Sequence, residues 1–171
     1  TLFTGAESYI KQIRLPFSFY VFRFMWSKVI IFAHNFVIYF GILIYFQIWP
    51  GSVALYAIPG FLLVTLNGVL ASMYLGMMSA RFRDIPQIMA SFIQIAFFIT
   101  PIMWKPELLG EHAQLMSYNP FFHLIEIVRA PLLGQIPSAG NYTAVALITV
   151  LNAMFAAMFF VRFRARISYW V

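Results

Sequence analysis

Residues 29–80 contain no Asp, Glu, Lys or Arg, and this uncharged run limits the possible folds of the chain more than any other feature. Soluble domains carry charged residues at roughly 25% of their positions. The whole chain has only 9% charged residues, 63% hydrophobic residues and a mean hydropathy of +0.85. These values argue against a soluble fold and indicate an integral membrane protein.

The uncharged run is long enough to cross a membrane twice. The turn-forming residues 48–52, with Trp49 and Pro50, divide it into spans over residues 29–49 and 53–80. Further uncharged runs predict spans over residues 85–104 and 142–161, each near the roughly 20 helical residues that cross about 30 Å of hydrocarbon. We expect an all-α integral membrane protein with four transmembrane helices. Pro59 is a candidate position for a kink in the second helix.

The basic residues indicate how the chain is oriented. Nine of its eleven Lys and Arg residues flank the predicted spans on one side: Lys11, Arg14, Arg23, Lys28, Arg81, Arg83, Arg162, Arg164 and Arg166. By the positive-inside rule that side is cytoplasmic. We therefore expect both ends of the chain in the cytoplasm and the long segment between the third and fourth spans outside.

Several classes of function have no support in the sequence. The absence of cysteine excludes disulfides, thiolate metal sites and cysteine nucleophiles. No H-E-x-x-H, G-x-S-x-G or phosphate-binding glycine loop occurs, and we expect His34 and Asn35 to be structural. We therefore predict that the chain is not an enzyme and binds no metal or cofactor. The net charge of +6 arises at the ends of spans and does not indicate nucleic-acid binding.

Three stripes of side chains recur at helical spacing within the spans. Gly68, Ser72, Gly76 and Ala80 are small residues four positions apart, which favours close helix packing. The other two stripes are polar or aromatic. The polar stripe fits packing hydrogen bonds or a translocation path, and the aromatic stripe fits lipid contact, core packing or a wall on which sugar rings stack. They are the polar residues Gln87, Ser91 and Gln94, which follow Asp84, and the aromatic residues Phe32, Phe36 and Tyr39.

Two regions outside the spans have amphipathic character. Residues 8–17 form a basic stretch in which Lys11 and Arg14 share one helical face and Ile10 and Ile13 the neighbouring one. The outer segment reads as two short helices over residues 106–118 and 120–133.

Short strings of residues stand in a fixed order along the chain. They are Lys11-Gln12-Ile13-Arg14-Leu15-Pro16, Ala80-Arg81-Phe82-Arg83-Asp84-Ile85, Thr100-Pro101-Ile102, and Asn119-Pro120-Phe121 with Arg129. In this order they resemble the permease subunits of bacterial ABC-2 type exporters for polysaccharides, which export O-antigen, capsule and teichoic acid. Residues 166–171 are also similar to an O-antigen exporter tail, so the resemblance spans essentially the whole chain.

The resemblance implies a fold and a set of partners. The four spans would be the last four of six, because such permeases begin with an amphipathic helix and two further spans. The permease would be a homodimer that pairs with two ATP-binding subunits, in which ATP and Mg²⁺ bind. It would move a lipid-linked polysaccharide across the bacterial inner membrane.

The resemblance also implies roles for particular residues. Segment 8–17, with Ile10, Lys11, Ile13, Arg14 and Pro16, would be the coupling helix that docks on the ATPase, and Arg81, Arg83 and Asp84 would lie at the second cytoplasmic turn. The outer helices, with Asn119, Pro120, Phe121 and Arg129, would be periplasmic gate helices. The simpler alternatives are that the basic stretch binds anionic lipid and that the arginines only anchor the topology.

Two other functions stay open from the sequence. The same type of exporter carrying a small amphiphile, such as a drug or lipid, would differ in the width of its channel. A polytopic membrane transferase would require a converging cluster of carboxylates or histidines at one membrane face, and Asp84 is the sole acidic residue after Glu7 on the predicted cytoplasmic side.

Overall fold

The chain is helical throughout the part that the structure describes. This computed structural model describes residues 2–12, 15–47, 49–102, 104, 114 and 116–170, and no strand occurs among them. The helices are, in order, η1 Thr4–Ala6, α1 Glu7–Gln12, α2 Phe17–Phe46, η2 Gly51–Tyr56, α3 Ala57–Arg81, α4 Ile85–Ile99, α5 Pro120–Leu132, α6 Ala139–Phe163, η4 Arg164–Arg166 and α7 Ile167–Trp170. The prediction of an all-α fold is therefore confirmed.

Three helical stretches are long and apolar enough to cross a membrane: Phe17–Phe46, Gly51–Arg81 and Ala139–Arg166. The expected span over residues 85–104 is only partly helical, because α4 ends at Ile99. Its 15 residues cover about 22 Å at 1.5 Å per residue, short of the hydrocarbon thickness. Three membrane-length helices fit a membrane protein, and a fourth is not confirmed.

Pro101 explains why α4 is shorter than the uncharged run. A residue before proline is sterically pushed out of the α region, and Thr100 has φ −81° and ψ 133°. The uncharged residues 100–102 and 104 are therefore not part of the helix, although hydropathy alone extended it to Trp104.

The N-terminal region differs from expectation in its boundaries. Helix α2 begins at Phe17, directly after Pro16, so Arg23 and Lys28 lie on the membrane-length helix and not ahead of it. Within the basic stretch, α1 covers residues 8–12 and α2 begins at Phe17, while Ile13 and Arg14 lie outside the described residues.

The outer segment and the second span also depart from the expected boundaries. Most of the expected outer helix 106–118 lies outside the described residues, whereas α5 matches the expected outer helix 120–133. Pro59 lies in the first turn of α3, just after a 3-10 segment, and not in mid-helix.

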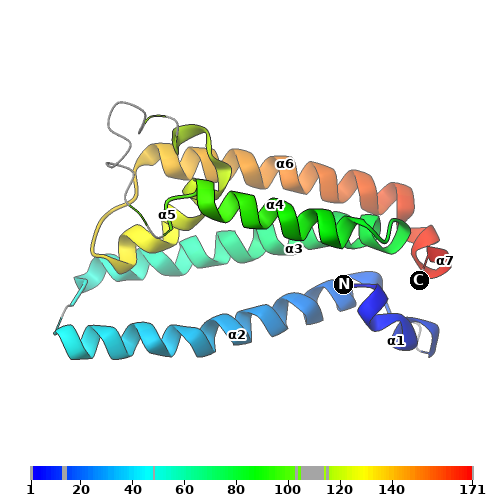
Figure 1. Ribbon diagram of the computed structural model, residues 1–171, viewed down its shortest axis with the longest axis horizontal. Coiled ribbons are helices and arrows are strands. Elements are labelled where there is room, and N and C mark those ends of the chain that lie inside the picture. The colour runs from blue at the N-terminus through cyan, green and yellow to red at the C-terminus, as the bar shows by residue number, and fades with distance from the viewer. Residues whose placement is uncertain are drawn as a thin grey trace.

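Both ends of the chain lie at the same end of the bundle (Figure 1). A core at this end joins the N-terminal segment, α2, α3 and α7, and contains Leu2, Phe3, Ala6, Tyr20, Val21, Met77, Ala80 and Ile167. The small-residue stripe of α3 faces side chains of the same chain. A Cβ on Gly76 would lie 3.1 Å from the Phe3 ring, and one on Gly68 would lie 2.7 Å from Met25 Cε.

Helix α3 lies between α2 and α6 in Figure 1 and contacts both. A polar network links α3 to α6 within the apolar bundle. Asn67 Nδ2 donates to Thr149 Oγ1 (2.8 Å) and to Leu63 O (3.0 Å), while Asn152 Nδ2 donates to Asn67 Oδ1 (2.8 Å). The Tyr74 hydroxyl donates to Asn152 Oδ1 (3.0 Å). Every polar atom of the buried Asn67 amide is thus satisfied, as a membrane-buried amide requires.

Candidate functional site

Helix α5 starts at a cap that also reaches α4. Asn119 Oδ1 accepts hydrogen bonds from the backbone N–H groups of Phe121 (3.0 Å) and Phe122 (3.4 Å), and Pro120 occupies the first helical turn. This is the arrangement that favours a helix start, because Pro has no N–H to leave unpaired there. The Asn119 Nδ2 group donates to Thr100 Oγ1 (3.1 Å). One side chain therefore begins α5 and fixes it to the end of α4.

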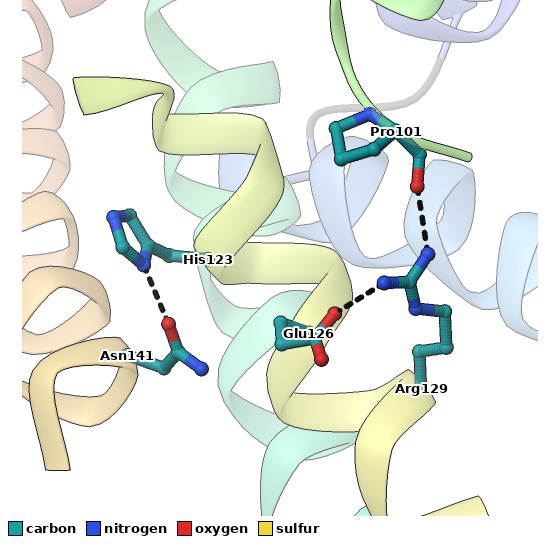
Figure 2. A network of polar contacts seen from close by, with 5 residues as sticks. All are labelled: Pro101, His123, Glu126, Arg129 and Asn141. Atoms are coloured by element: carbon teal, nitrogen blue, oxygen red, sulfur yellow. Dashed lines mark hydrogen bonds and ion pairs between the residues drawn. The ribbon is translucent and has the colours of Figure 1, made fainter. Parts of the chain in front are cut away.

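Arg129 makes a second link between α5 and the end of α4. Its Nη1 donates to the carbonyl oxygen of Pro101 (2.7 Å), and its Nη2 lies 2.8 Å from Glu126 Oε2 (Figure 2). The contact with Glu126 is an ion pair without hydrogen-bond geometry, since Glu126 Oε2 and Arg129 Nε are buried and make no hydrogen bond with described residues. The Phe121 ring also lies 6.0 Å from Phe92 of α4.

We call this assembly the α4–α5 joint: Thr100, Pro101, Asn119, Phe121 and Arg129. Two strings that are separated in the sequence meet in it: Thr100-Pro101-Ile102, and Asn119-Pro120-Phe121 with Arg129. All four residues expected at the gate, Asn119, Pro120, Phe121 and Arg129, lie in or directly beside it.

His123 anchors the other side of α5 to α6. Its Nδ1 lies 2.8 Å from Asn141 Oδ1 (Figure 2), and its Nε2 lies 2.9 Å from the carbonyl oxygen of Ser117. His123 and Asn141 are 8% and 7% exposed. The sequence alone gives His123 no role, because its partner is 18 residues away and the contact depends on how α5 packs on α6.

The predicted aromatic row lines a large cavity between α2, α3 and α5, with a volume of about 730 Å³. Phe32 stacks on Phe61 of α3 (4.6 Å between centroids) and on Phe36 (5.5 Å), and Phe36 stacks on Tyr39 (4.9 Å). The Tyr39 hydroxyl donates to the carbonyl oxygen of Leu132 (2.6 Å). We call this space the aromatic cavity, and its lining is almost entirely apolar.

The polar half of the predicted path lies elsewhere. Gln87, Ser91 and Gln94 are exposed on α4 and do not line the aromatic cavity. Their side chains make no hydrogen bond with any residue that the structure describes. The two parts of the predicted path are therefore not brought together within one chain.

Those of the expected coupling residues that the structure describes lie at the end of the bundle that holds the termini (Figure 1). Ile10 packs against the core at that end, and Pro16 precedes α2. Arg81 lies over the rings of Phe82 (5.0 Å) and Trp170 (5.4 Å).

For the other residues expected at the coupling face, the structure shows mainly their position along the chain. Lys11 lies in α1. Arg83 and Asp84 are exposed, and Asp84 has no ion pair with the described part of the chain. Cooperation between the two arginines and Asp84 stays a prediction.

The described residues contain no group of three or more His, Cys, Asp or Glu side chains that would hold a metal ion. In comparisons with known proteins, no family model, no curated protein and no solved structure matches this chain.

Proposed function

We propose that this chain is the membrane-spanning subunit of an ATP-driven exporter that moves a lipid-linked polysaccharide across the bacterial inner membrane. One observation carries the proposal. Two sequence strings that resemble those of such permeases, Thr100-Pro101-Ile102 and Asn119-Pro120-Phe121 with Arg129, converge in the α4–α5 joint. Arg81, Arg162 and Arg164 stand at the C-terminal ends of α3 and α6, at the opposite end of the bundle (Figure 1).

The proposal makes α4 the fourth membrane crossing. Helix α4 begins at the end that holds the termini and leads to α5 at the other end (Figure 1). Thr100 is extended and adds about 3.3 Å to the length of α4, and the Ile102 N–H then bonds back to the Thr100 carbonyl oxygen (2.7 Å) in a tight turn at Pro101. Non-helical backbone is tolerated at membrane depth where protein buries it and satisfies its polar groups. Thr100 and Pro101 are fully buried, and Arg129 bonds the Pro101 carbonyl oxygen.

With four crossings, both termini are cytoplasmic and α5 lies at the periplasmic face as a gate helix. Arg81, Arg83, Arg162, Arg164 and Arg166 then stand at the cytoplasmic face, where the positive-inside rule expects them. Helix α1 and the α3–α4 turn form the face that meets the separate ATP-binding subunit, which supplies ATP and Mg²⁺.

Helix α3 is the physical connection between that face and the gate. Its Gly76 packs against Phe3 near the termini, and its Gly60 packs directly on the backbone of α5 at Ile127. A displacement of α3 by the ATPase therefore reaches α5 without any flexible linker.

The aromatic cavity and the polar stripe of α4 form the transport path in a dimer. Aromatic rings provide stacking surfaces for sugar rings. Exposed Gln87, Ser91 and Gln94 would be costly against lipid, so they face the second copy or the aqueous path.

Reconstitution with the partner ATPase tests the proposal. Proteoliposomes holding both subunits should translocate lipid-linked polysaccharide when ATP is present, and neither subunit should do so alone. Phe36→Ala should reduce export while the complex still assembles. Val37→Ala is the matched control, because Val37 is 63% exposed and does not line the cavity. Equal export by both variants would remove the aromatic row from the path.

A small amphiphile is the second candidate substrate, and the apolar lining of the aromatic cavity favours it. The same vesicles distinguish the two. ATP-dependent movement of a fluorescent phospholipid without movement of polysaccharide would replace the first proposal by the second.

A further inference from the structure

A second cavity of about 360 Å³ lies beside the contact between α5 and α6, and it differs in chemistry from the aromatic cavity. We call it the polar pocket. Its lining includes Phe122, His123 and Glu126 from α5, Asn141 from α6, and Ser117 and Ser138 from the adjoining turns. Its size falls at the small end of ligand sites, which are about 300–1,000 Å³.

The polar groups of this pocket are held in place before any ligand arrives. His123 is fixed between Ser117 O and Asn141, and the Asn141 backbone N–H donates to Ser138 Oγ (3.2 Å). Fixed polar groups lose little entropy when they bind, which is the main advantage of a preorganised site.

The Asn141 amide has one polar atom left over. Its Oδ1 contacts His123, whereas its Nδ2 has no partner among the described residues. Asn141 is nevertheless only 7% exposed. If the amide is rotated so that Nδ2 meets the imidazole, Oδ1 becomes the free atom. In either orientation one hydrogen-bonding atom is available to the pocket.

Glu126 adds a fixed acceptor. Arg129 holds its Oε2 at 2.8 Å, and Oε1 has no hydrogen bond with the described part of the chain. Phe122 supplies an aromatic ring in the same lining. A negative carboxylate disfavours phosphate or another anion, whereas a carboxylate oxygen, an amide and a ring face together match the hydroxyls and the C–H face of a neutral sugar.

We infer that the polar pocket binds one neutral sugar residue of the exported polymer, at the outer end of the bundle and apart from the aromatic cavity. The inference rests on the proposed function only in naming the polymer as the source of that sugar. A residue held there as the chain emerges would favour forward movement over slipping back.

Saturation-transfer NMR on the full chain with its ATPase in nanodiscs tests the pocket directly. The probes are the methyl glycosides of glucose, galactose, mannose, rhamnose and N-acetylglucosamine, and trisaccharides of the same sugars, in which the middle residue resembles a position within a polymer. We expect transfer to ring protons of at least one methyl glycoside and to the middle residue of its trisaccharide.

Two variants and a control identify the site. Glu126→Gln and Phe122→Leu should each weaken the signal at least about fivefold, the equivalent of about one hydrogen bond or ring contact. Phe122→Leu is the second variant because it keeps an apolar side chain on α5 and leaves the ion pair between Glu126 and Arg129 intact, which Glu126→Gln does not. Thr143→Val is the control. Thr143 is exposed on α6 and does not line the pocket, and among the described residues its hydroxyl bonds only the Gly140 carbonyl oxygen.

The outcomes separate this inference from the proposed function. No transfer from any glycoside, or transfer that survives both pocket variants, overturns the inference even if export is intact. Binding of methyl glycosides without their trisaccharides overturns the polymer as the source. Binding that the variants abolish supports the pocket even if the vesicles fail to export polysaccharide, in which case only the proposed function falls.

Discussion

Helix α2 and helix α3 are similar in length and hydropathy, yet they are held in the bundle in very different ways. Along α2 only Tyr20 and Val21 are buried, and both lie near its start. Helix α3 buries residues along its whole length, from Ala57 to Ala80, and bonds α6 through the Asn67 network. The comparison shows that hydropathy selects membrane helices but does not determine how they associate, since lipid is as apolar as their side chains.

The difference divides the molecule into two parts, which we call the fixed unit (α3, α4, α5 and α6) and the arm (α2). Helices α3, α5 and α6 pack on one another, and Arg129 ties α4 to them. Over the aromatic cavity, α2 meets this unit through ring contacts and the hydrogen bond from Tyr39 to Leu132 O. A separation of α2 from the fixed unit at the aromatic cavity would therefore leave the Asn67 network intact.

The largest expected effect comes from filling the closest contact in the fixed unit. A methyl group at Gly60 would collide with the backbone carbonyl oxygen of Ile127, which cannot move aside as a side chain can. We expect Gly60→Ala to destabilise the protein by about 3 kcal/mol, at the upper end of overpacking costs. Thermal unfolding in detergent measures it.

Gly41→Ala on α2 is the matched control for that substitution. Nothing lies within 4 Å of a Cβ at Gly41, so the change should be neutral or slightly stabilising. Equal melting temperatures for the two variants would contradict the division into a fixed unit and an arm. Gly68→Ala should cost less than Gly60→Ala, since the atom it meets is the flexible end of Met25.

The next effect tests the α4–α5 joint. Arg129→Met removes the donor to Pro101 O and leaves Glu126 without its ion pair. The two side chains are 30% and 17% exposed, which screens part of the loss, and we expect about 2 kcal/mol. Hydrogen exchange at the backbone amides of Asn119, Phe121 and Phe122 should rise as the stability falls. Arg162→Met, at an exposed arginine on α6, should leave that exchange unchanged.

A smaller effect is expected at the polar network between α3 and α6. Asn67→Ala leaves Asn152 and Thr149 without their shared partner, and hydrogen bonds between membrane helices are worth about 0.6 kcal/mol on average and at most about 1.7. We expect a loss of about 1 kcal/mol in an SDS unfolding titration. Adding Asn152→Ala should cost less than the sum of the single changes. Asn35→Ala, exposed on α2, should have no effect, and a loss as large as that of Asn67→Ala would refute the contrast.

The smallest effect is expected at the hydrogen bond that joins α2 to the end of α5. Tyr39→Phe removes the hydrogen bond to Leu132 O, worth about 0.5–1.5 kcal/mol. Because the chain has no cysteine, spin labels at Ile38→Cys and Leu133→Cys report the distance between α2 and the end of α5. That distribution should broaden in Tyr39→Phe and stay unchanged in Tyr45→Phe, whose ring is 81% exposed. A narrow distribution in both would show that the hydrogen bond does not restrain α2.

Uncharged runs in the sequence predicted the helices well, and their ends less well. The run over residues 85–104 has no charge to mark its end, so only the steric effect of Pro101 on Thr100 explains why α4 stops early. Helix α2 starts ahead of its predicted span because a helix continues through Arg23 and Lys28 into the basic region, which hydropathy does not register.

The contacts between helices were less accessible to sequence reasoning. Asn67, Thr149 and Asn152 are polar residues inside apolar spans and were a usable signal that the sequence analysis missed, although their pairing depends on helix rotation. The contact between His123 and Asn141 depends on the angle between α5 and α6, which no local pattern encodes. The residues of the α4–α5 joint were singled out by resemblance, and their hydrogen bonds supply the physical reason for that grouping.

The central claim is that the chain crosses the membrane four times, with α4 among the crossings and the α4–α5 joint outside. Single cysteines at Trp49, Phe82, Ile136 and Tyr169, all exposed, test it with a membrane-impermeant maleimide on intact spheroplasts. We predict labelling from outside at positions 49 and 136, and labelling at 82 and 169 only after permeabilisation. If position 136 instead labels together with 82, α4 does not cross the membrane and the four-crossing account is wrong.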